Sequence, residues 1–383
     1  MTRRGLGRST GMGAIAAGLV ALGKTPDAEA KKRRLRGEHN IRGDKAIICF
    51  EGETLRIPKR KRKKWIKRGA ARGACRDCVP VCTPGSCDTA DGCGGACACA
   101  AGSICVQGVC QACTVACDST PAQCGKDLSQ ALAKGGDIFV CPGRYGGPFG
   151  VKTAVRIYGA GGGADAAANT ILDGQKTDAT VTVGEKVAAA FTRLRIVNGD
   201  NPDEKGGGGG IFAAEGSQVT VSDCVIDGNK AVSGGGVYFR GTLEMIATQV
   251  TNNTSYPGSG GGITGSSAAS DTSVLRNCLI SGNSGAVDGS GSGGGLFIDV
   301  KNMSIEGTEI SGNTGNKVGG IHVESLVTSP KVTIDAASTV TGNLATGKVT
   351  AGGLARSGFS TVALNGTTIT GNTDPQCAGE TCS

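Results

Sequence analysis

The chain has 383 residues, of which 67 are glycine and only 3% are aromatic. Glycine normally makes up about 7% of a protein, so this composition excludes an ordinary helical enzyme, and the clustering of the glycines in short runs excludes collagen. The net charge of +8 is unevenly divided, because residues 1–75 hold 21 Lys and Arg against 6 Asp and Glu. Charge that attracts anionic partners is therefore expected near the N-terminus.

Residues 1–30 have the order of an export signal peptide. The pair Arg3-Arg4 precedes a mildly apolar stretch rich in Gly and Ala, and Ala28-Glu29-Ala30 offers small residues for cleavage. The twin arginines resemble those of a twin-arginine export signal. No apolar run of eighteen residues follows, so we expect a secreted, extracellular or cell-surface protein without a transmembrane segment.

The basic segment, residues 31–74, carries most of its cations between Arg56 and Arg68. Such runs bind polyanions. Outside the cell the expected partner is a polysaccharide or an anionic cell-wall polymer, and no nucleic acid is expected. Cys49 and Cys75 frame a stretch that looks like a short module of exported bacterial proteins, although that module's histidines are absent. The alternative interpretation is a solvated charged linker.

The cysteine-rich module, residues 75–124, has twelve cysteines and almost no large apolar side chains. It therefore needs cross-links to fold, and about six disulfides are expected in an exported chain. Their connectivity cannot be read from the sequence. Zinc is the alternative, because Cys75-x2-Cys78 and Cys110-x2-Cys113 have zinc-ribbon spacing. We expect a rigid spacer or a small binding module.

Beyond residue 124 two motifs repeat every 24 to 33 residues. Glycine runs precede the aliphatic residues Ile211, Val237, Ile263, Leu296, Ile321 and Leu354. A second motif, mostly Gly-Asn, ends in Asn229, Asn253, Asn283, Asn313, Asn343 and Asn372, which we call the ladder asparagines. The segments between them alternate with strand periodicity. A repeat of this length without a helix predicts one turn of a parallel β-helix, stacked ~4.8 Å from the next.

Small residues recur five positions before each ladder asparagine and predict one inward stack: Cys224, Thr248, Cys278, Thr308, Ser338 and Thr367. Two of them, Cys224 and Cys278, lie two turns apart, about 10 Å, which is too far for a disulfide. We expect buried free thiols there. Cys377 and Cys382 remain to close the C-terminal tail, residues 377–383. The full set of candidate disulfide residues is Cys49, Cys75, Cys124, Cys141, Cys377 and Cys382.

These repeats look like those of right-handed parallel β-helix repeat proteins of the pectin-lyase-like class, including relatives of the polymorphic outer-membrane protein repeats. Residues 127–134 and 136–145 resemble the capping helix and first strand with which such solenoids begin. The resemblance implies an all-β fold. We expect a right-handed parallel β-helix solenoid over residues 125–376 with an N-terminal capping helix, preceded by the basic segment and a small disulfide-rich module.

The resemblance leaves the activity open, because this fold serves enzymes, adhesins and stalks. Polygalacturonase-type relatives carry three aspartates with a Gly-His-Gly. This chain has no Gly-His-Gly and only two histidines, His39 and His322, which disfavours hydrolysis by paired carboxylates. We expect a structural, adhesive or glycan-binding role and no certain cofactor. The alternative is a polysaccharide lyase of pectate-lyase-like type, or another carbohydrate-active enzyme acting on an acidic polysaccharide.

The strand after each glycine run predicts a candidate site. If the aliphatic residues point inward, the next residues form an outward, largely aromatic column: Phe212, Tyr238, Thr264, Phe297 and His322. A second outward column follows with Arg240, Ser266, Asp299 and Glu324. Aromatic faces beside charged groups suit a sugar chain, so the candidate substrate-binding residues are Phe212, Tyr238, Arg240, Phe297, Asp299, His322 and Glu324. Asp299 and Glu324 are also candidate Ca2+ ligands. The alternative is a sheet whose aromatics are shielded by neighbouring loops.

Overall fold

The computed structural model describes residues 45–50, 53–68, 71–72, 85–87, 98–202, 207–285, 291–325, 329–347 and 351–379. The chain divides into two compact units, residues 1–80 with 92–95, and residues 81–91 with 96–383. Each unit is considered by itself. The expected export signal, Cys75 and Cys382 lie outside the described residues.

The first unit contains a folded part of the basic segment. Two strands come before a short helical stretch in the sequence and a third comes after it, and together the strands form an antiparallel sheet of order β2–β1–β3. Ile48 and Ile57 are buried between the two, with Trp65 packed against them. The linker interpretation is therefore wrong for this part of the segment. Its elements are β1 (Lys45–Phe50), β2 (Glu53–Pro58), the 3-10 helix η1 (Lys59–Lys61), α2 (Arg62–Ile66) and β3 (Ala71–Arg72).

The second unit begins with a disulfide-linked segment. An antiparallel hairpin joins β4 (Ser103–Val106) to β5 (Val109–Ala112). Four disulfides cross-link the described cysteines between residues 87 and 141, as expected for a chain segment with little apolar surface. The pairs are Cys87–Cys105, Cys99–Cys110, Cys113–Cys141 and Cys117–Cys124.

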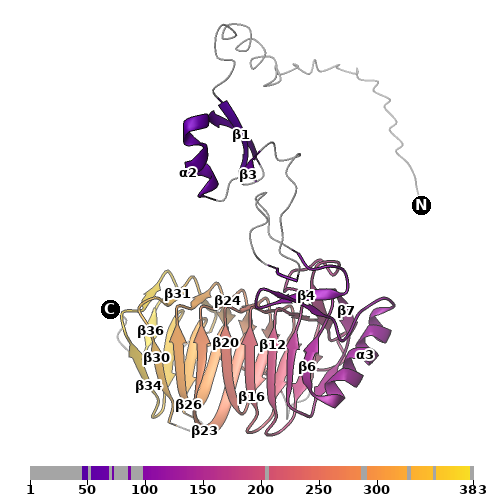
Figure 1. Ribbon diagram of the computed structural model, residues 1–383. Helices are drawn as coiled ribbons and strands as arrows, with labels where there is room; N and C mark the ends of the chain where they lie inside the picture. The colour runs from indigo at the N-terminus through magenta and orange to yellow at the C-terminus, as the bar shows by residue number, and fades with distance from the viewer. Residues whose placement is uncertain are drawn as a thin grey trace, which may run out of the picture. The chain divides into compact units, whose positions relative to one another are not determined.

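Helix α3 (Pro121–Lys134) covers the first turns of the solenoid (Figure 1). Pro121 occupies its first turn, and the Thr120 hydroxyl accepts the Gln123 N–H at 3.4 Å, a favourable helix start. Leu128 and Leu132 enter the solenoid core. This confirms the predicted capping helix. With 14 residues α3 is short, and no helix in the described ranges is long and apolar enough to cross a membrane.

The solenoid itself consists of parallel strands stacked turn upon turn (Figure 1), which confirms the predicted parallel β-solenoid. Its largest sheet has sixteen strands in the described residues. They are β6 (Gly136–Phe139), β8 (Phe149–Val151), β9 (Val155–Tyr158), β11 (Val181–Val183), β12 (Ala188–Thr192), β15 (Ile211–Ala213), β16 (Gln218–Ser222), β19 (Val237–Phe239), β20 (Thr242–Ile246), β23 (Ile263–Arg276), β26 (Leu296–Glu306), β29 (Ile321–Glu324), β30 (Lys331–Ile334), β33 (Leu354–Ser357), β34 (Thr361–Leu364) and β36 (Cys377–Ala378).

Two further parallel sheets complete each turn. A nine-stranded sheet contains β7 (Gly143–Gly146), β10 (Thr170–Asp173), β13 (Arg195–Val197), β17 (Val225–Asp227), β21 (Gln249–Thr251), β24 (Leu279–Ser281), β27 (Glu309–Ser311), β31 (Thr339–Thr341) and β35 (Thr368–Thr370). A sheet of two-residue strands contains β14 (Asp200–Asn201), β18 (Lys230–Ala231), β22 (Thr254–Ser255), β25 (Ser284–Gly285), β28 (Thr314–Gly315) and β32 (Leu344–Ala345).

The strand register follows the repeats. Each aliphatic residue after a glycine run pairs with its counterpart in the next turn, from Ile211 to Leu354, and all are buried. One apolar cluster runs from α3 to the last turns. The glycines before these residues allow the turns to approach closely. At Gly320, for example, a Cβ atom would lie only 2.3 Å from the Gly353 carbonyl oxygen.

The ladder asparagines form a continuous buried stack. The Oδ1 of each accepts both the backbone N–H and the Nδ2–H of the previous one, and Gln376 Oε1 ends the series at Asn372. Their backbones are not left-handed. The left-handed residue is the one before, such as Asn252 (φ 54°) or Gly282 (φ 65°). The motif thus divides its tasks between two residues, one for the turn and one for hydrogen bonds.

The predicted stack of small residues is also buried throughout. Thr and Ser hydroxyls accept backbone N–H groups from the preceding turn, as Thr308 does from Cys278 at 3.2 Å. Cys224 and Cys278 are free and buried, as predicted. Burial raises the pKa of the Cys224 thiol to about 12 and also raises that of Cys278. Both are therefore protonated and unreactive in the folded protein.

Candidate functional site

The predicted outward column divides into an accessible part and a covered part. Phe212 and Tyr238 are half-buried, and their rings stack with centroids 6.0 Å apart and an interplanar angle of 24°. The exposed Arg240 places its guanidinium 5.7 Å from the centre of the Tyr238 ring. These three side chains form the aromatic platform. It combines ring faces with hydrogen-bond donors, the combination that a sugar ring requires.

The remaining column residues are buried, so the predicted exposure is wrong for them. Thr264, Phe297 and His322 are only 4%, 7% and 6% exposed. The register is nevertheless as predicted, because the three residues pair in sequence on β23, β26 and β29. The segment before the glycine run accounts for part of the cover, since the Thr264 hydroxyl donates to the Ser259 carbonyl at 2.8 Å. The shielded interpretation therefore holds for this part of the sheet.

His322 is a buried and uncharged imidazole. Its ring packs edge-on against Phe297 with centroids 5.5 Å apart. Nδ1 has no hydrogen-bond partner, and Nε2 lies 3.5 Å from the Ser357 hydroxyl. Burial, with a smaller contribution from Lys317, lowers the pKa of His322 to about 4. The ring is neutral at pH 7.

The carboxylates of Asp299 and Glu324 lie on the adjacent strands β26 and β29, as predicted. Burial raises the pKa of Glu324, the charge of Asp299 raises it further, and Lys317 opposes both. Asp299 is only 1% exposed. The pectate-lyase-like alternative would use carboxylates near a basic side chain, as Asp299 and Glu324 are near Lys317. The buried Asp299, however, is closed to a polymeric substrate. These two residues also do not form part of a larger ligand cluster with neighbouring Asp, Glu, His or Cys residues in the described ranges.

The helical stretch of the first unit carries a dense group of cations. None of them forms an ion pair with a carboxylate of the described residues. By contrast, solenoid cations such as Arg144 and Arg276 are paired with Asp173 and Glu306. We call this group the basic cluster. Its eight exposed members are Lys59, Arg60, Lys61, Arg62, Lys63, Lys64, Lys67 and Arg68.

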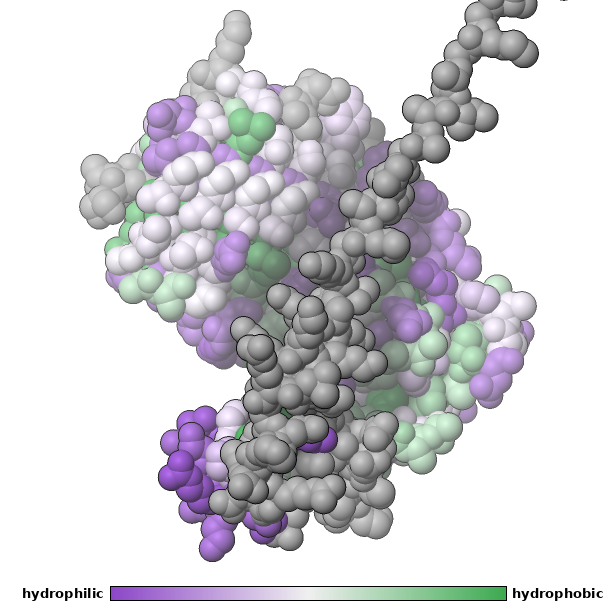
Figure 2. All heavy atoms as spheres, turned by 90° about the horizontal axis from the view of Figure 1, so that it is seen from above, coloured by the Kyte–Doolittle hydropathy of each residue, from purple (hydrophilic) through white to green (hydrophobic). Residues whose placement is uncertain are grey.

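The outer face of the nine-stranded sheet is different in character. Figure 2 shows regular rows of pale atoms, of intermediate hydropathy, on the face seen from above. One outward column there consists of hydroxyl side chains stacked in register: Thr251, Ser281, Ser311, Thr341 and Thr370. Sequence reasoning missed this column, although the Thr-Val-Thr and Thr-Ile-Thr strands contain its signal. This column offers hydroxyl groups, but it has neither the cations of the basic cluster nor the aromatic rings of the aromatic platform.

The sequence left the disulfide connectivity open, and the structure pairs Cys141 with Cys113 and Cys124 with Cys117. Cys110 bonds to Cys99, so the Cys110-x2-Cys113 spacing does not form one site. Cys377 is disulfide-bonded. Cys49 lies in β1, opposite Thr54.

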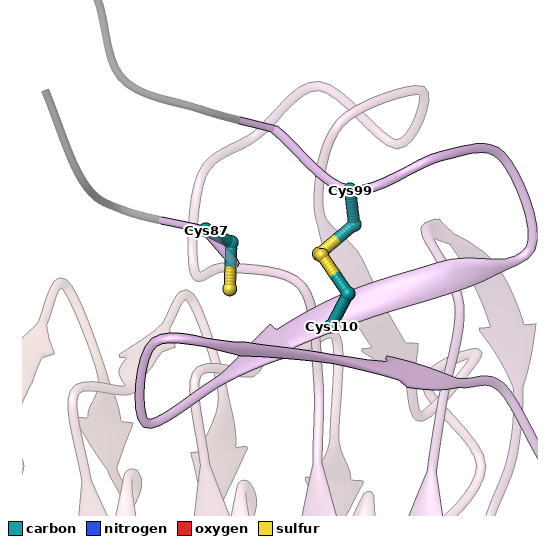
Figure 3. Close-up of side chains that lie close together, drawn as sticks. All are labelled: Cys87, Cys99 and Cys110. Carbon is teal, nitrogen blue, oxygen red and sulfur yellow. A yellow bond between two sulfur atoms is a disulfide. The ribbon is translucent and has the colours of Figure 1, made fainter. Parts of the chain in front are cut away.

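Three sulfur atoms from separate parts of the module nevertheless gather at one place. The Sγ atoms of Cys87, Cys99 and Cys110 all lie within 4.8 Å of one another (Figure 3). Among the described residues no other group of three or more potential metal ligands is this compact. The spacing of the zinc-ribbon motif did not reveal this group.

Comparison of the chain with protein-family models, with curated proteins and with solved structures found no match.

Proposed function

We propose that this protein is an extracellular or cell-surface adhesive β-solenoid that binds an anionic polymer through its basic cluster. One observation carries the proposal: eight exposed cations, without carboxylate partners among the described residues, lie on η1, on α2 and just after it, and this stretch packs on a small core of its own. A folded support limits the conformational entropy lost when these side chains bind. The positive charge is therefore presented ready to bind.

The class of polymer follows from the compartment. Four disulfides in the described part of the chain favour an oxidising environment. Nucleic acid is scarce there, whereas acidic polysaccharides and anionic wall polymers are abundant at bacterial surfaces. The solenoid would then carry further surfaces, such as the aromatic platform.

The salt dependence of binding tests this proposal. Lys61, Lys63 and Lys64 are replaced together by Gln in the full chain, and retention on immobilised polygalacturonate is measured from about 50 to 200 mM salt. The matched control replaces the exposed solenoid residues Lys126, Lys152 and Lys331 by Gln, which removes the same charge. Each cation that contacts the polymer releases a counterion, so we expect the slope of log affinity against log salt to become shallower by about 2 in the first variant.

The control variant is expected to keep the wild-type slope. Equal losses in both variants would show that only net charge matters, and unchanged binding by the Lys61, Lys63 and Lys64 variant would refute the basic cluster as the attachment site. Neutral dextran, which releases no counterions, serves as the ligand control.

The aromatic platform supports a second contact, with a carbohydrate ring. Replacing Tyr238 by Ala removes one stacked ring and the partner of Arg240, and aromatic contacts of this kind are worth about 0.5–2 kcal/mol. We expect about tenfold weaker glycan binding with an unchanged salt slope. The control is Tyr256→Ala, because Tyr256 is 51% exposed elsewhere on the solenoid. Equal affinities for the two variants in a glycan titration would leave the platform without this role.

A further inference from the structure

Two disulfides lie close together at the β4–β5 hairpin. Cys105 and Cys110 are directly opposite each other in the hairpin. Cys105 bonds to Cys87, and Cys110 bonds to Cys99. The sulfurs of Cys87, Cys99 and Cys110, which Figure 3 labels, lie within 4.8 Å of one another, and the Cys105 sulfur is bonded to that of Cys87. The sulfurs of the two disulfides therefore come together from three separate chain segments.

Backbone hydrogen bonds contribute to this arrangement independently of the disulfides. Residues 85–87 run beside β5 and pair with it through an isolated bridge between Ser86 and Val109. The Cys87 N–H donates to the Gly108 carbonyl at 3.0 Å, and the Cys110 N–H donates to the Gly85 carbonyl at 2.7 Å. Opening the disulfides would leave Cys87, Cys105 and Cys110 on one hydrogen-bonded scaffold. Cys99 lies next to Ala100, whose carbonyl accepts the Ser103 N–H at 3.1 Å.

The sulfur spacing is close to that of a zinc–thiolate site. Tetrahedral zinc binds thiolates at ~2.3 Å, which places the sulfurs about 3.8 Å apart. The sulfurs of Cys99 and Cys110 are bonded, at about 2 Å, and the Cys87 sulfur lies within 4.8 Å of both, so each of these separations has to change by less than about 2 Å to reach that value. Cys87 is 1% exposed and the other two are half-buried. Low water access of this kind favours a closed, structural site.

We propose that Cys87, Cys99, Cys105 and Cys110 form a redox-controlled Zn2+ site, holding one ion as thiolates when reduced and forming two disulfides when oxidised. With a phosphine reductant, each disulfide takes up two electrons, and the phosphine becomes a phosphine oxide with oxygen from water. The four thiols then release four protons as they bind the ion as thiolates. In the reverse direction two molecules of a small disulfide oxidant accept four electrons, become four thiols after protonation, and release Zn2+.

The site gives the cysteine-rich module a cross-link in both environments. Before export, in a reducing compartment, the metal would hold the hairpin together with residues 85–87 and Cys99. After export, the disulfides would replace it with the same sulfurs. This inference is independent of polymer binding, since none of the four cysteines lies in the basic cluster or the aromatic platform.

Cobalt substitution tests the site directly. The full chain is reduced with a phosphine under native conditions and titrated with Co2+ and then Zn2+, whose thiolate complexes are followed by charge-transfer absorption and by chelator competition. The test variant is Cys87→Ser with Cys110→Ser, and the matched control is Cys117→Ser with Cys124→Ser, which removes a disulfide outside the group. We expect the test variant to bind one Zn2+ fewer per chain than the wild type, and the control to bind as many. Equal stoichiometry in the test variant and the wild type would overturn the proposal.

A second measurement needs no variant. The reduced wild-type chain is alkylated with and without Zn2+, and the modified cysteines are located by peptide mass spectrometry. We expect Zn2+ at ten times its dissociation constant to slow the labelling of Cys87, Cys99, Cys105 and Cys110 by about tenfold, while Cys117 and Cys124 react at unchanged rates. Equal labelling of the four residues with and without Zn2+ would disprove the site even if the variants failed to fold.

Discussion

At the scale of single residues, the ladder asparagines show how a polar side chain can hold a solenoid core together. Asn283 illustrates the pattern, because its Oδ1 accepts two hydrogen bonds from Asn253, each 3.0 Å long. Its own N–H donates to Asn313 Oδ1 at 3.0 Å, and its Nδ2 donates to the Val250 carbonyl at 2.9 Å. Every polar atom of the side chain is therefore satisfied without water.

Replacing Asn283 by Ala should be strongly destabilising. Two donors of Asn253 and the Val250 carbonyl would lose buried partners, and each such loss costs about 1–3 kcal/mol. We expect the free energy of unfolding, measured in urea, to fall by about 3 kcal/mol or more. The control is Asn365→Ala, because Asn365 is exposed and should change stability by less than about 0.5 kcal/mol. Similar losses in both variants would contradict a special role for the ladder.

His322 should make stability depend on pH. Its pKa is about 4 in the folded chain and about 6.5 in an unfolded one, so the unfolded state binds the proton more tightly between these values. The neutral His322 ring therefore makes its full contribution to stability above pH 6.5, and this contribution is lost as the pH falls toward 4. The difference between the two pKa values corresponds to about 3 kcal/mol.

His322→Phe is the variant that isolates this effect, because a ring of similar size can pack beside Phe297 and cannot be protonated. The charged groups near His322 and Glu324, namely Lys317 and Asp299, remain in both proteins. We expect the wild type to lose stability relative to the variant between pH 6.5 and 4.5 in urea titrations, and the difference to be constant above pH 7. Parallel stability curves across the whole range would show that His322 does not titrate on unfolding.

At the scale of elements, the capping helix lies unusually close to the first solenoid turn. An added Cβ atom at Gly125 in α3 would lie 1.8 Å from the carbonyl oxygen of Gly146 in β7. Replacing a mid-helix glycine by alanine ordinarily stabilises a helix by about 1 kcal/mol. Here alanine should instead destabilise the protein, because the helix would have to move away from the core that Leu128 and Leu132 fill.

Thermal unfolding of Gly125→Ala tests this close packing. We expect a lower Tm than for the wild type. The control is Gly150→Ala in β8, where an added Cβ meets no atom within 4 Å, and its Tm should stay near the wild-type value. An unchanged or raised Tm for Gly125→Ala would mean that α3 does not pack in this position.

Sequence patterns predicted the elements of the solenoid well, since both repeats carry local chemistry. The glycine runs and aliphatic residues determine the register, and the small residue at Cys224 and its equivalents follows from the same period. The exposure of Phe297 and His322 could not be predicted in this way. It depends on how the segments before the glycine runs fold over the sheet, and these segments vary in length and composition.

At the scale of the whole molecule, charge and cross-links are both concentrated toward the N-terminal part of the chain. The cations of the basic cluster lie on η1, on α2 and just after it, and none is paired with a carboxylate of the described residues, whereas solenoid cations such as Arg195 pair with acidic residues such as Asp227. The unequal charge was visible in the composition, but the core of Ile48, Ile57 and Trp65 that orders it was not. The disulfide pairs could not be predicted either, because so many closely spaced cysteines allow many alternative pairings.

The disulfides also determine how the chain responds to tension. The chain between the basic cluster and the core of the solenoid passes through Cys87–Cys105 and Cys113–Cys141, with sequence separations of 18 and 28 residues. Force from an attached polymer would be carried by these disulfides, so the loops that they enclose could not extend. Reduction of either disulfide would free the residues that it encloses to extend under the same pull, so the response to tension depends on the redox environment.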